Sequence, residues 1–270
     1  MRCLLLLPVF LLLLGAGSAM ACGPDSDCVI ENRHYRISLP EGYDGTRPVG
    51  AILFAHGYRG TAMGTMRNKA LRRMASELGV ALVALKSAGE DWIIPNSPHH
   101  TDADGSVEFS YVDAVLKDIT RRFAIDDRRI VAAGFSAGGM MVWNLACAMP
   151  ERFAGFVAMS GTFWRAPPEN CQPAVTSMVH IHGRSDPVVP IAGRVIADTV
   201  QGDVRTAVET YAASGGFSAA RAQDTERLQC AIRDNTDGDV LQFCTFDGGH
   251  SFRADFLRYG WETLERAGKL

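Results

Sequence analysis

The sequence predicts an α/β fold of the doubly wound kind, with a mostly parallel sheet and helices on both faces. Two observations carry this prediction. Several apolar runs continue without polar alternation, which is typical of strands that are buried on both faces. Segments with helical spacing of apolar residues lie between these runs. Because strands and helices alternate along the chain, the strands are expected to lie parallel in one sheet.

Each element follows from its own pattern. The first strand, at 35–39, alternates as a half-buried strand does, whereas the later strands are continuous apolar runs. Apolar residues at helical spacing, such as Met66, Ala70, Met74 and Leu78, predict the first helix. In chain order we predict strands at 35–39 and 50–55, a helix at 65–78, a strand at 80–85, a helix at 107–123, a strand at 129–134, a helix at 137–149, and strands at 153–159 and 178–181.

Length and composition indicate a single globular domain. The chain has 270 residues, of which 47% are hydrophobic and 21% are charged, and its formal net charge is −3. A charge so small and so evenly spread argues against nucleic acid as the main partner. No linker, repeat or low-complexity tract divides residues 22–270, so we predict one domain there.

Residues 1–21 are predicted to be a secretory signal peptide. Arg2 supplies a positive start, Leu4–Leu14 is almost entirely apolar, and Ala19–Ala21 fits a small-residue cleavage site. The apolar run is about half of the ~20 residues that span a bilayer, so no membrane span is expected. These features predict a secreted or periplasmic protein. A lipoprotein anchored at Cys22 is the alternative, because that residue would follow the cleavage site.

Six cysteines remain once Cys3 leaves with the signal peptide. An even number in an exported chain favours disulfides, and proximity along the sequence favours one set of pairs. The segment 235–239 has part of the ligand set of a calcium loop, but it lies between two strand-like runs and is expected to be a hairpin turn. The predicted disulfides are Cys22–Cys28, Cys147–Cys171 and Cys230–Cys244.

One short motif predicts a nucleophile. The strand at 129–134 leads into Gly134-Phe135-Ser136-Ala137-Gly138, and a helix follows at once. This is a G-x-S-x-G pattern in the context where it forms a sharp strand-to-helix turn and exposes a serine hydroxyl. Small residues are needed on both sides because the backbone doubles back there. We therefore predict that Ser136 is a nucleophile.

A seryl nucleophile needs a histidine base and a carboxylate that orients the histidine, in the chain order Ser, Asp, His for this fold. Of the seven histidines, only His250 follows both the serine and a plausible acid. Asp186 comes directly after the apolar run at 178–181, and Pro187 prevents that strand from continuing. Asp186 is therefore the predicted acid, and Asp247 is the alternative.

Two backbone N–H groups are predicted to hold the negative oxygen that develops during acyl transfer. One belongs to Ala137, at the start of the helix after the nucleophile, and the other to Tyr58, in the loop after the run at 50–55. Gly57 would let the backbone turn so that the Tyr58 N–H faces the site. His56 is interpreted as a buried ring that supports this loop.

Several further motifs occur together over nearly the whole mature chain. They include YRISLP at 35–40, HGYRG at 56–60, GFSAGG at 134–139, HGRSDPVVP at 182–190 and GGHSF at 248–252. In this combination they resemble the serine esterases of the α/β-hydrolase superfamily, in particular the secreted polyhydroxybutyrate depolymerase and feruloyl esterase group. The resemblance implies an α/β-hydrolase fold, a triad of Ser136, Asp186 and His250, and oxyanion donors at Tyr58 and Ala137.

The predicted function is hydrolysis of carboxylic esters through an acyl-enzyme on Ser136. Short-chain, feruloyl-type and hydroxyalkanoate esters are the expected substrates, either as small molecules or as oligomers. No metal or organic cofactor is expected. Two alternatives stay open, namely a serine peptidase of the same superfamily and a catalytically inactive binding protein on a hydrolase scaffold.

Two predicted loops at the active edge are rich in aromatic residues. Trp92 follows the run at 80–85, and Phe163 and Trp164 follow the run at 153–159. We expect these three residues to line an open cleft that favours short or aromatic acyl groups, without a lipase lid. The adjacent His99-His100 pair matches no metal-ligand spacing and is expected to lie in a solvated loop.

Overall fold

The computed structural model describes residues 22–168, 171 and 175–270, so the predicted signal peptide lies outside the described residues. A ten-stranded sheet has the order β1-β2-β4-β3-β5-β6-β7-β12-β11-β10, and β8 and β9 form a separate hairpin. The strands are Cys28–Ile30 (β1), Arg33–Ser38 (β2), Val49–Ala55 (β3), Ala81–Ala84 (β4), Ile125–Phe135 (β5), Gly155–Met159 (β6), Met178–Gly183 (β7), Arg194–Ile196 (β8), Thr199–Gln201 (β9), Arg221–Ala222 (β10), Gln229–Asp234 (β11) and Val240–Phe246 (β12). The α-helices are Ala62–Arg67 (α1), Lys69–Glu77 (α2), Ser106–Arg122 (α3), Ala137–Ala148 (α4), Val204–Ser214 (α5) and Ala254–Arg266 (α6), and Pro150–Arg152 forms a short 3₁₀ turn.

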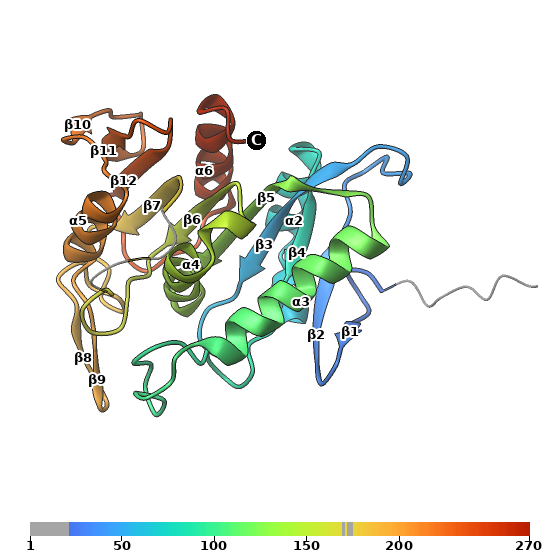
Figure 1. Ribbon diagram of the computed structural model, residues 1–270, viewed down its shortest axis with the longest axis horizontal. Coiled ribbons are helices and arrows are strands. Elements are labelled where there is room, and N and C mark those ends of the chain that lie inside the picture. The colour runs from blue at the N-terminus through green and yellow to red at the C-terminus, as the bar shows by residue number, and fades with distance from the viewer. Residues whose placement is uncertain (1–21, 169–170, 172–174) are drawn as a thin grey trace, which may run out of the picture.

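The centre of the sheet is parallel, and antiparallel strands extend both of its edges. Strands β4, β3, β5, β6, β7 and β12 run in the same direction. The pairs β1–β2, β2–β4, β10–β11 and β11–β12 are antiparallel. This arrangement confirms the predicted mostly parallel sheet, and it brings the carboxyl ends of β5, β7 and β12 to one edge (Figure 1). Ligands of open α/β sheets bind at that edge.

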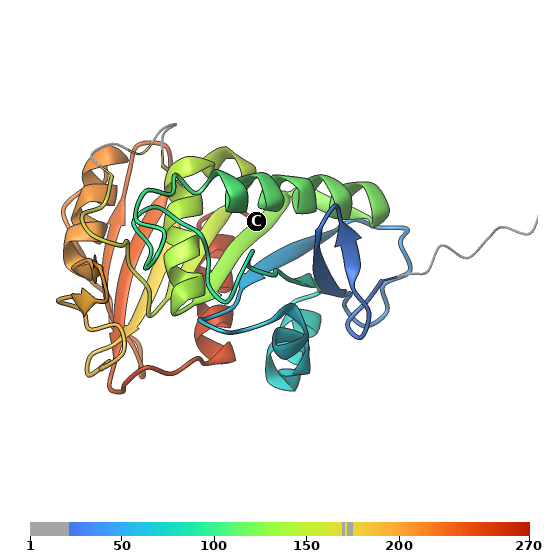
Figure 2. The ribbon, with the colours of Figure 1, turned by 90° about the horizontal axis from the view of Figure 1, so that it is seen from below.

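Helices cover both faces of the sheet (Figure 2). Helices α3, α4 and α5 lie on one face, and α1, α2 and α6 lie on the other. Successive residues of β3 enter opposite cores, since Leu53 packs on the α3–α5 side whereas Ile52 and Phe54 pack on the opposite side. Burial on both faces explains why these strands are continuously apolar in the sequence.

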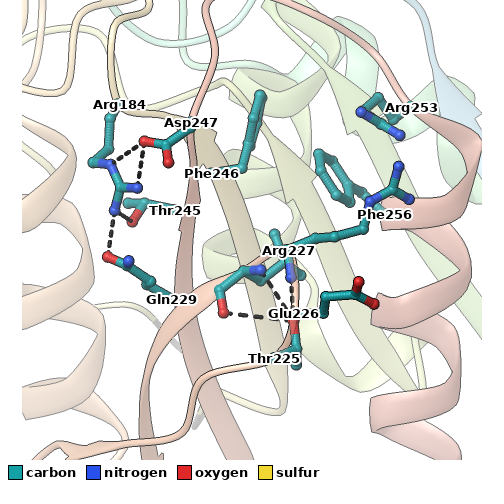
Figure 3. Close-up of a pocket in the computed structure, with 11 residues that line it drawn as sticks. Arg184, Thr225, Glu226, Arg227, Gln229, Thr245, Phe246, Asp247, Arg253 and Phe256 are labelled. Carbon is teal, nitrogen blue, oxygen red and sulfur yellow. Dashed lines mark hydrogen bonds and ion pairs between the residues drawn. The ribbon is translucent and has the colours of Figure 1, made fainter.

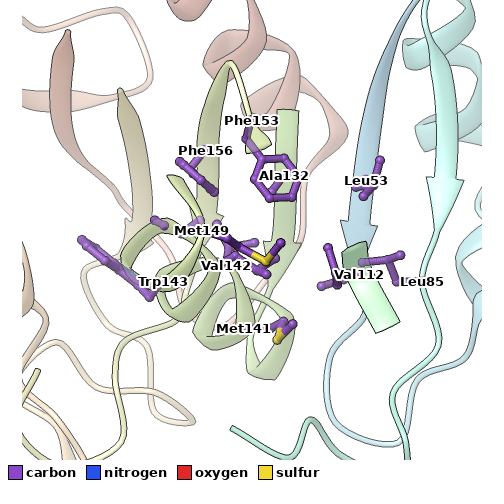
Figure 4. Packing of buried hydrophobic residues seen from close by; sticks show 14 of the residues in the cluster. Leu53, Leu85, Val112, Ala132, Met141, Val142, Trp143, Met149, Phe153 and Phe156 are labelled. Carbon is purple, nitrogen blue, oxygen red and sulfur yellow. The ribbon is translucent and has the colours of Figure 1, made fainter. Parts of the chain in front are cut away.

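Helix α4, which follows Ser136, lies deep in the larger core. Figure 4 shows Met141, Val142 and Trp143 of this helix packed among residues of the neighbouring strands, including Phe156. Every residue of α4 except Ala148 is buried. A helix that is packed on all sides has little freedom to shift, so the turn at its N-terminus is held in place.

The helix predicted at 65–78 is in fact two helices. Helix α1 ends at Arg67 and α2 begins at Lys69, with Asn68 between them in an extended conformation. The Asn68 side chain accepts a hydrogen bond from the Leu71 N–H at 3.1 Å and so caps α2. Both helices bury their apolar side against the same face of the sheet, so the apolar spacing alone did not indicate the break.

All three predicted disulfides are present. Cys230 and Cys244 lie opposite each other on β11 and β12, and the turn at 235–239 joins these strands as predicted. Within the described residues, no helix has the length and apolar character needed to cross a bilayer. The bonded pairs are Cys22–Cys28, Cys147–Cys171 and Cys230–Cys244.

Candidate active site

Ser136 lies in a tight turn between β5 and α4. Its backbone has φ 59° and ψ −123°, a conformation that non-glycine residues rarely adopt and that the flanking elements impose. A Cβ on Gly134 would overlap the Gly138 carbonyl oxygen, and a Cβ on Gly138 would overlap that of Ala55. Glycine at both positions therefore lets α4 start directly above the ends of β5 and β3, with Ser136 at the turn.

The structure brings Ser136, Asp186 and His250 together at the carboxyl edge of the sheet. His250 Nε2 lies 2.9 Å from Ser136 Oγ, and His250 Nδ1 lies 2.7 Å from Asp186 Oδ2. The imidazole thus stands between a hydroxyl and a carboxylate. In this arrangement the ring can accept the hydroxyl proton while the carboxylate stabilises the imidazolium that forms.

The carboxylate of Asp186 is buried and held by backbone donors. Its Oδ1 accepts hydrogen bonds from the N–H groups of Val188 at 2.8 Å and Val189 at 2.9 Å. Burial by itself would raise the pKa of Asp186, but these bonds and the one from His250 outweigh it, so the pKa lies below its usual value. The carboxylate is therefore ionised at neutral pH and free to stabilise a charged imidazolium.

The loop that carries His250 is fastened to the loop that carries Asp186. The Ser185 N–H donates to the Gly248 carbonyl oxygen at 3.0 Å, and a Cβ on Gly183 would overlap the backbone of the histidine loop. This close approach holds acid and base together although they are 64 residues apart in the sequence.

Asp247, the alternative acid, makes a different contact. Figure 3 shows its carboxylate turned toward the Arg184 guanidinium in a polar cavity of about 270 Å³. The two side chains form an ion pair with 2.5 Å between Asp247 Oδ1 and Arg184 Nη2, and the Asp247 side chain is largely exposed. This pair ties the end of β7 to the start of the histidine loop.

The predicted oxyanion donors are the N–H groups of Tyr58 and Ala137. Neither donates a hydrogen bond to any of the residues that the structure describes. The backbone before Tyr58 lies against the nucleophile, since a Cβ on Gly57 would be 3.4 Å from Ser136 Cβ and 3.9 Å from its Oγ. Two unpaired donors beside a nucleophilic oxygen are what an oxyanion hole requires.

His56 supports the 56–60 loop in the way that its sequence position predicted. Its Nδ1 lies 2.9 Å from the Gly57 carbonyl oxygen, and its Nε2 accepts the Ser87 N–H at 3.3 Å. Burial lowers the pKa of His56 to about 4, so the ring is neutral at pH 7. With one nitrogen facing an acceptor and the other facing a donor, the ring carries its hydrogen on Nδ1.

A cavity of about 460 Å³ opens beside Ser136. Its wall is mostly apolar, and polar side chains occupy part of the rim. Burial raises the pKa of one of these, Asp91, to about 6. The apolar lining comes from Ile93, Met140, Trp164, Val188, Val189 and Ile196, and the polar lining includes Tyr58, Asp91, His99, His100, Arg194 and Gln201.

The three aromatic residues predicted to line a cleft have different positions. Trp164 lines the cavity, but Trp92 and Phe163 are only 1% and 3% exposed and pack in the core, which corrects their assignment as pocket residues. Trp92 stacks on His56 with ring centroids 4.9 Å apart, and its Nε1 donates to the His56 carbonyl oxygen at 2.8 Å. Phe163 packs on Trp143. An aromatic residue after a strand can serve either purpose, and the sequence does not distinguish them.

The hairpin of β8 and β9, which was not predicted from the sequence, covers one side of the cavity. Its Gln201 pairs with Trp164 of one predicted loop, and Thr199 donates to the Asn96 carbonyl oxygen of the other at 2.7 Å. The cleft is therefore bridged rather than open between the two loops. In this hairpin Arg194 and Ile196 line the cavity and Val195 is 74% exposed, and three residues are too short a run to predict a strand from the sequence.

His99 and His100 lie exposed in a loop as predicted, and they also line the cavity. In the part of the chain that the structure describes, no group of three or more His, Cys, Asp or Glu side chains is arranged to hold a metal ion. Because both side chains are exposed and line the cavity, they can contact a molecule bound there.

Comparisons with known proteins point to ester hydrolysis. A family model described as Phospholipase/Carboxylesterase matches residues 92–220. The putative esterase NocK of Nocardia uniformis subsp. tsuyamanensis is 29% identical over 244 residues, which cover 82% of this chain and 69% of that protein. A probable feruloyl esterase C of Aspergillus oryzae is 26% identical over 242 residues, covering 87% and 84%. The acetyl xylan esterase from Aspergillus awamori has a TM-score of 0.63 and 15% identity, and the match covers 93% of this chain and 97% of that one.

These similarities confirm the predicted resemblance to esterases, and the structural match confirms the α/β-hydrolase fold. The relatives and structural neighbours that these comparisons find are carboxylic ester hydrolases, so the fold and the sequence similarities agree on this class of enzyme.

Proposed function

We propose that this protein is an exported serine esterase in which Ser136, His250 and Asp186 form the catalytic triad. The observation that carries the proposal is the pair of hydrogen bonds that joins the three side chains, 2.9 Å and 2.7 Å long, at the mouth of a cavity. A packing role for these residues would not require a strained serine turn, nor two backbone donors beside it that have no acceptor among the described residues.

In the proposed mechanism, Ser136 Oγ attacks the ester carbonyl carbon while His250 Nε2 takes its proton. The carbonyl oxygen becomes negative and accepts hydrogen bonds from the N–H groups of Tyr58 and Ala137. The bond to the alcohol oxygen then breaks, and His250 returns its proton to the leaving alcohol. Water, deprotonated by the same ring, attacks the acyl-enzyme and releases the acid.

The cavity favours short or aromatic acyl groups. Its volume of about 460 Å³ is in the range of pockets for small organic ligands, and Trp164, although only 6% exposed, contributes an aromatic side chain to its lining. Hydroxyl groups of a substrate can bond to Asp91, His100 or Gln201 at the rim. Relatives named as feruloyl esterases, and a structural neighbour named as an acetyl xylan esterase, support esters of this kind.

Export and a single-domain organisation over residues 22–270 are part of the proposal. The three disulfides support an oxidising compartment, where such bonds persist. The Cys22–Cys28 bond supports a secreted or periplasmic protein over a lipid-anchored one.

A substrate ladder with the Ser136→Ala variant tests the proposal. Wild type should hydrolyse p-nitrophenyl acetate, butyrate or methyl ferulate with higher kcat/KM than p-nitrophenyl palmitate. Ser136→Ala should retain less than about one thousandth of wild-type kcat and fold normally, because triad members act as a unit. Peptidase activity that exceeds esterase activity, or a variant that keeps more than about a tenth of kcat, would contradict the proposal.

A further inference from the structure

A chain of hydrogen bonds runs through the core to the loop that carries Asp186. Trp143 Nε1 donates to His180 Nδ1 at 3.1 Å, His180 Nε2 lies 2.9 Å from His182 Nδ1, and His182 Nε2 lies 2.7 Å from the Val189 carbonyl oxygen. All three rings are 0% exposed. Three linked polar rings in a core demand an explanation, because apolar side chains would fill the same space without the cost of burying polar groups.

The two groups at the ends of this series of hydrogen bonds, the Trp143 indole and the Val189 carbonyl, allow only one placement of the ring hydrogens. An indole N–H can only donate, so His180 Nδ1 is an acceptor and the hydrogen of that ring is on Nε2. It follows that His182 Nδ1 accepts and that His182 Nε2 carries a hydrogen. The Val189 carbonyl oxygen, which can only accept, completes the chain. Burial lowers the pKa of both histidines, so neutral rings are expected at pH 7.

His182 Nε2, the last donor in this series of hydrogen bonds, lies close to the Asp186 carboxylate. His182 Nε2 is 3.6 Å from Asp186 Oδ2, the oxygen that bonds to His250. It also holds the carbonyl of Val189, the residue whose N–H donates to Asp186 Oδ1. The ring is in contact with the carboxylate but too far from it for a hydrogen bond, so it restrains the acid through the Val189 backbone, whose N–H binds the carboxylate.

We propose that His182 is a positioning residue for Asp186, and that Trp143, acting through His180, fixes the tautomer that lets His182 do so. The inference rests on the proposed triad. It assigns to two buried histidines, which do not touch the reacting atoms, a role in keeping the acid directed at His250.

Kinetics of His182 variants test this role. His182→Phe keeps an aromatic ring but removes both nitrogens, so kcat for p-nitrophenyl acetate should fall about tenfold to a hundredfold while KM stays within about twofold. His182→Gln retains an amide donor at the same distance from the backbone and should recover most of kcat. Tyr211→Phe is the matched control, because it removes another buried hydrogen bond beside Trp143, to the Thr176 carbonyl oxygen, and should leave kcat unchanged.

Tautomers can be read directly by NMR of protein labelled with ¹⁵N-histidine, even where a kinetic variant folds poorly. In wild type, His180 and His182 should both be neutral with hydrogen on Nε2. In Trp143→Phe, His180 should show a mixture of tautomers. A ring of wild type with hydrogen on Nδ1, or a charged ring at pH 7, would overturn the inference.

The outcomes separate this inference from the proposed function. If Ser136→Ala keeps activity, the triad itself is wrong. If Ser136→Ala is inactive while His182→Phe folds and keeps wild-type kcat, only the positioning role fails. An equal loss of kcat in His182→Phe and His182→Gln would also contradict the positioning role, because only the glutamine variant keeps a hydrogen-bond donor at this position.

Discussion

Trp92→Phe should weaken both the fold and the reaction, because Trp92 supports the proposed oxyanion loop. Its indole N–H donates to the His56 carbonyl oxygen at 2.8 Å, one residue before Gly57 and two before Tyr58. The same loop is tied to the neighbouring segment by a bond of 2.8 Å from the Arg59 N–H to the Glu90 carbonyl oxygen. Phenylalanine fills most of the space but removes the donor.

The expected magnitude follows from what the change leaves behind. His56 is 4% exposed, so its carbonyl oxygen would lose a partner in a buried place, which costs about 1–3 kcal/mol. The smaller ring adds roughly 1 kcal/mol for lost packing. The free energy of unfolding should therefore fall by about 2–4 kcal/mol. Removing one oxyanion donor outright costs about a hundredfold or more in kcat, so a displaced donor should cost about tenfold with little change in KM.

Urea unfolding and steady-state hydrolysis of p-nitrophenyl acetate measure the two effects. Trp261→Phe is a matched control, because Trp261 is 1% exposed but its indole makes no hydrogen bond with the described residues. That variant should lose only the packing contribution and keep kcat. If Trp92→Phe matches Trp261→Phe in both measurements, the hydrogen bond to His56 does not hold the loop.

Three further predictions concern acid stability, a disulfide and the cavity. Burial places the folded-state pKa of His56 at about 4, below its usual value, so the contribution of this residue to stability is complete above about pH 6.5 and is lost as pH falls toward 4. The free energy of unfolding from urea titrations should therefore fall by about 2–3 kcal/mol over this range, and by less in His56→Gln. A free energy that does not change with pH would contradict this prediction. Replacing Cys230 and Cys244 together by alanine should cost about 2–4 kcal/mol in thermal unfolding with kcat unchanged at 25 °C, and an unaltered Tm would show that this bond does not stabilise the fold. Trp164→Ala should lower kcat/KM about tenfold for methyl ferulate but little for p-nitrophenyl acetate, and equal losses would mean that Trp164 does not contact the acyl ring.

The sequence predicted the positions that topology controls. Ser136, Asp186 and His250 each follow a strand of the parallel sheet, so their order and the strand ends were enough to select them. The choice of Asp186 over Asp247 depended on the same reasoning, and Asp247 pairs with Arg184 in the structure. The G-x-S-x-G motif could be recognised in the sequence because the close approach of backbones around Ser136 requires glycine at positions 134 and 138.

Features that depend on contacts between distant segments could not be predicted in the same way. Trp92 and Trp164 both follow strands, and only the packing of one against His56 and the bridge of the other to Gln201 separate a core residue from a cavity residue. The break at Asn68 was hidden because both helices bury the same side. His182 was set aside as a base by its position in the chain, and its contact with Val189 is visible only in three dimensions.

Covalent labelling tests the central claim most directly. A fluorophosphonate probe reacts with a serine that is activated by a neighbouring base, and digestion followed by mass spectrometry locates the adduct. The proposed triad predicts one adduct, on Ser136, which forms in wild type, is lost in Ser136→Ala and forms far more slowly in His250→Ala. A folded wild-type protein that takes up no probe, or that carries the adduct on another residue, would contradict the assignment of Ser136 as the nucleophile.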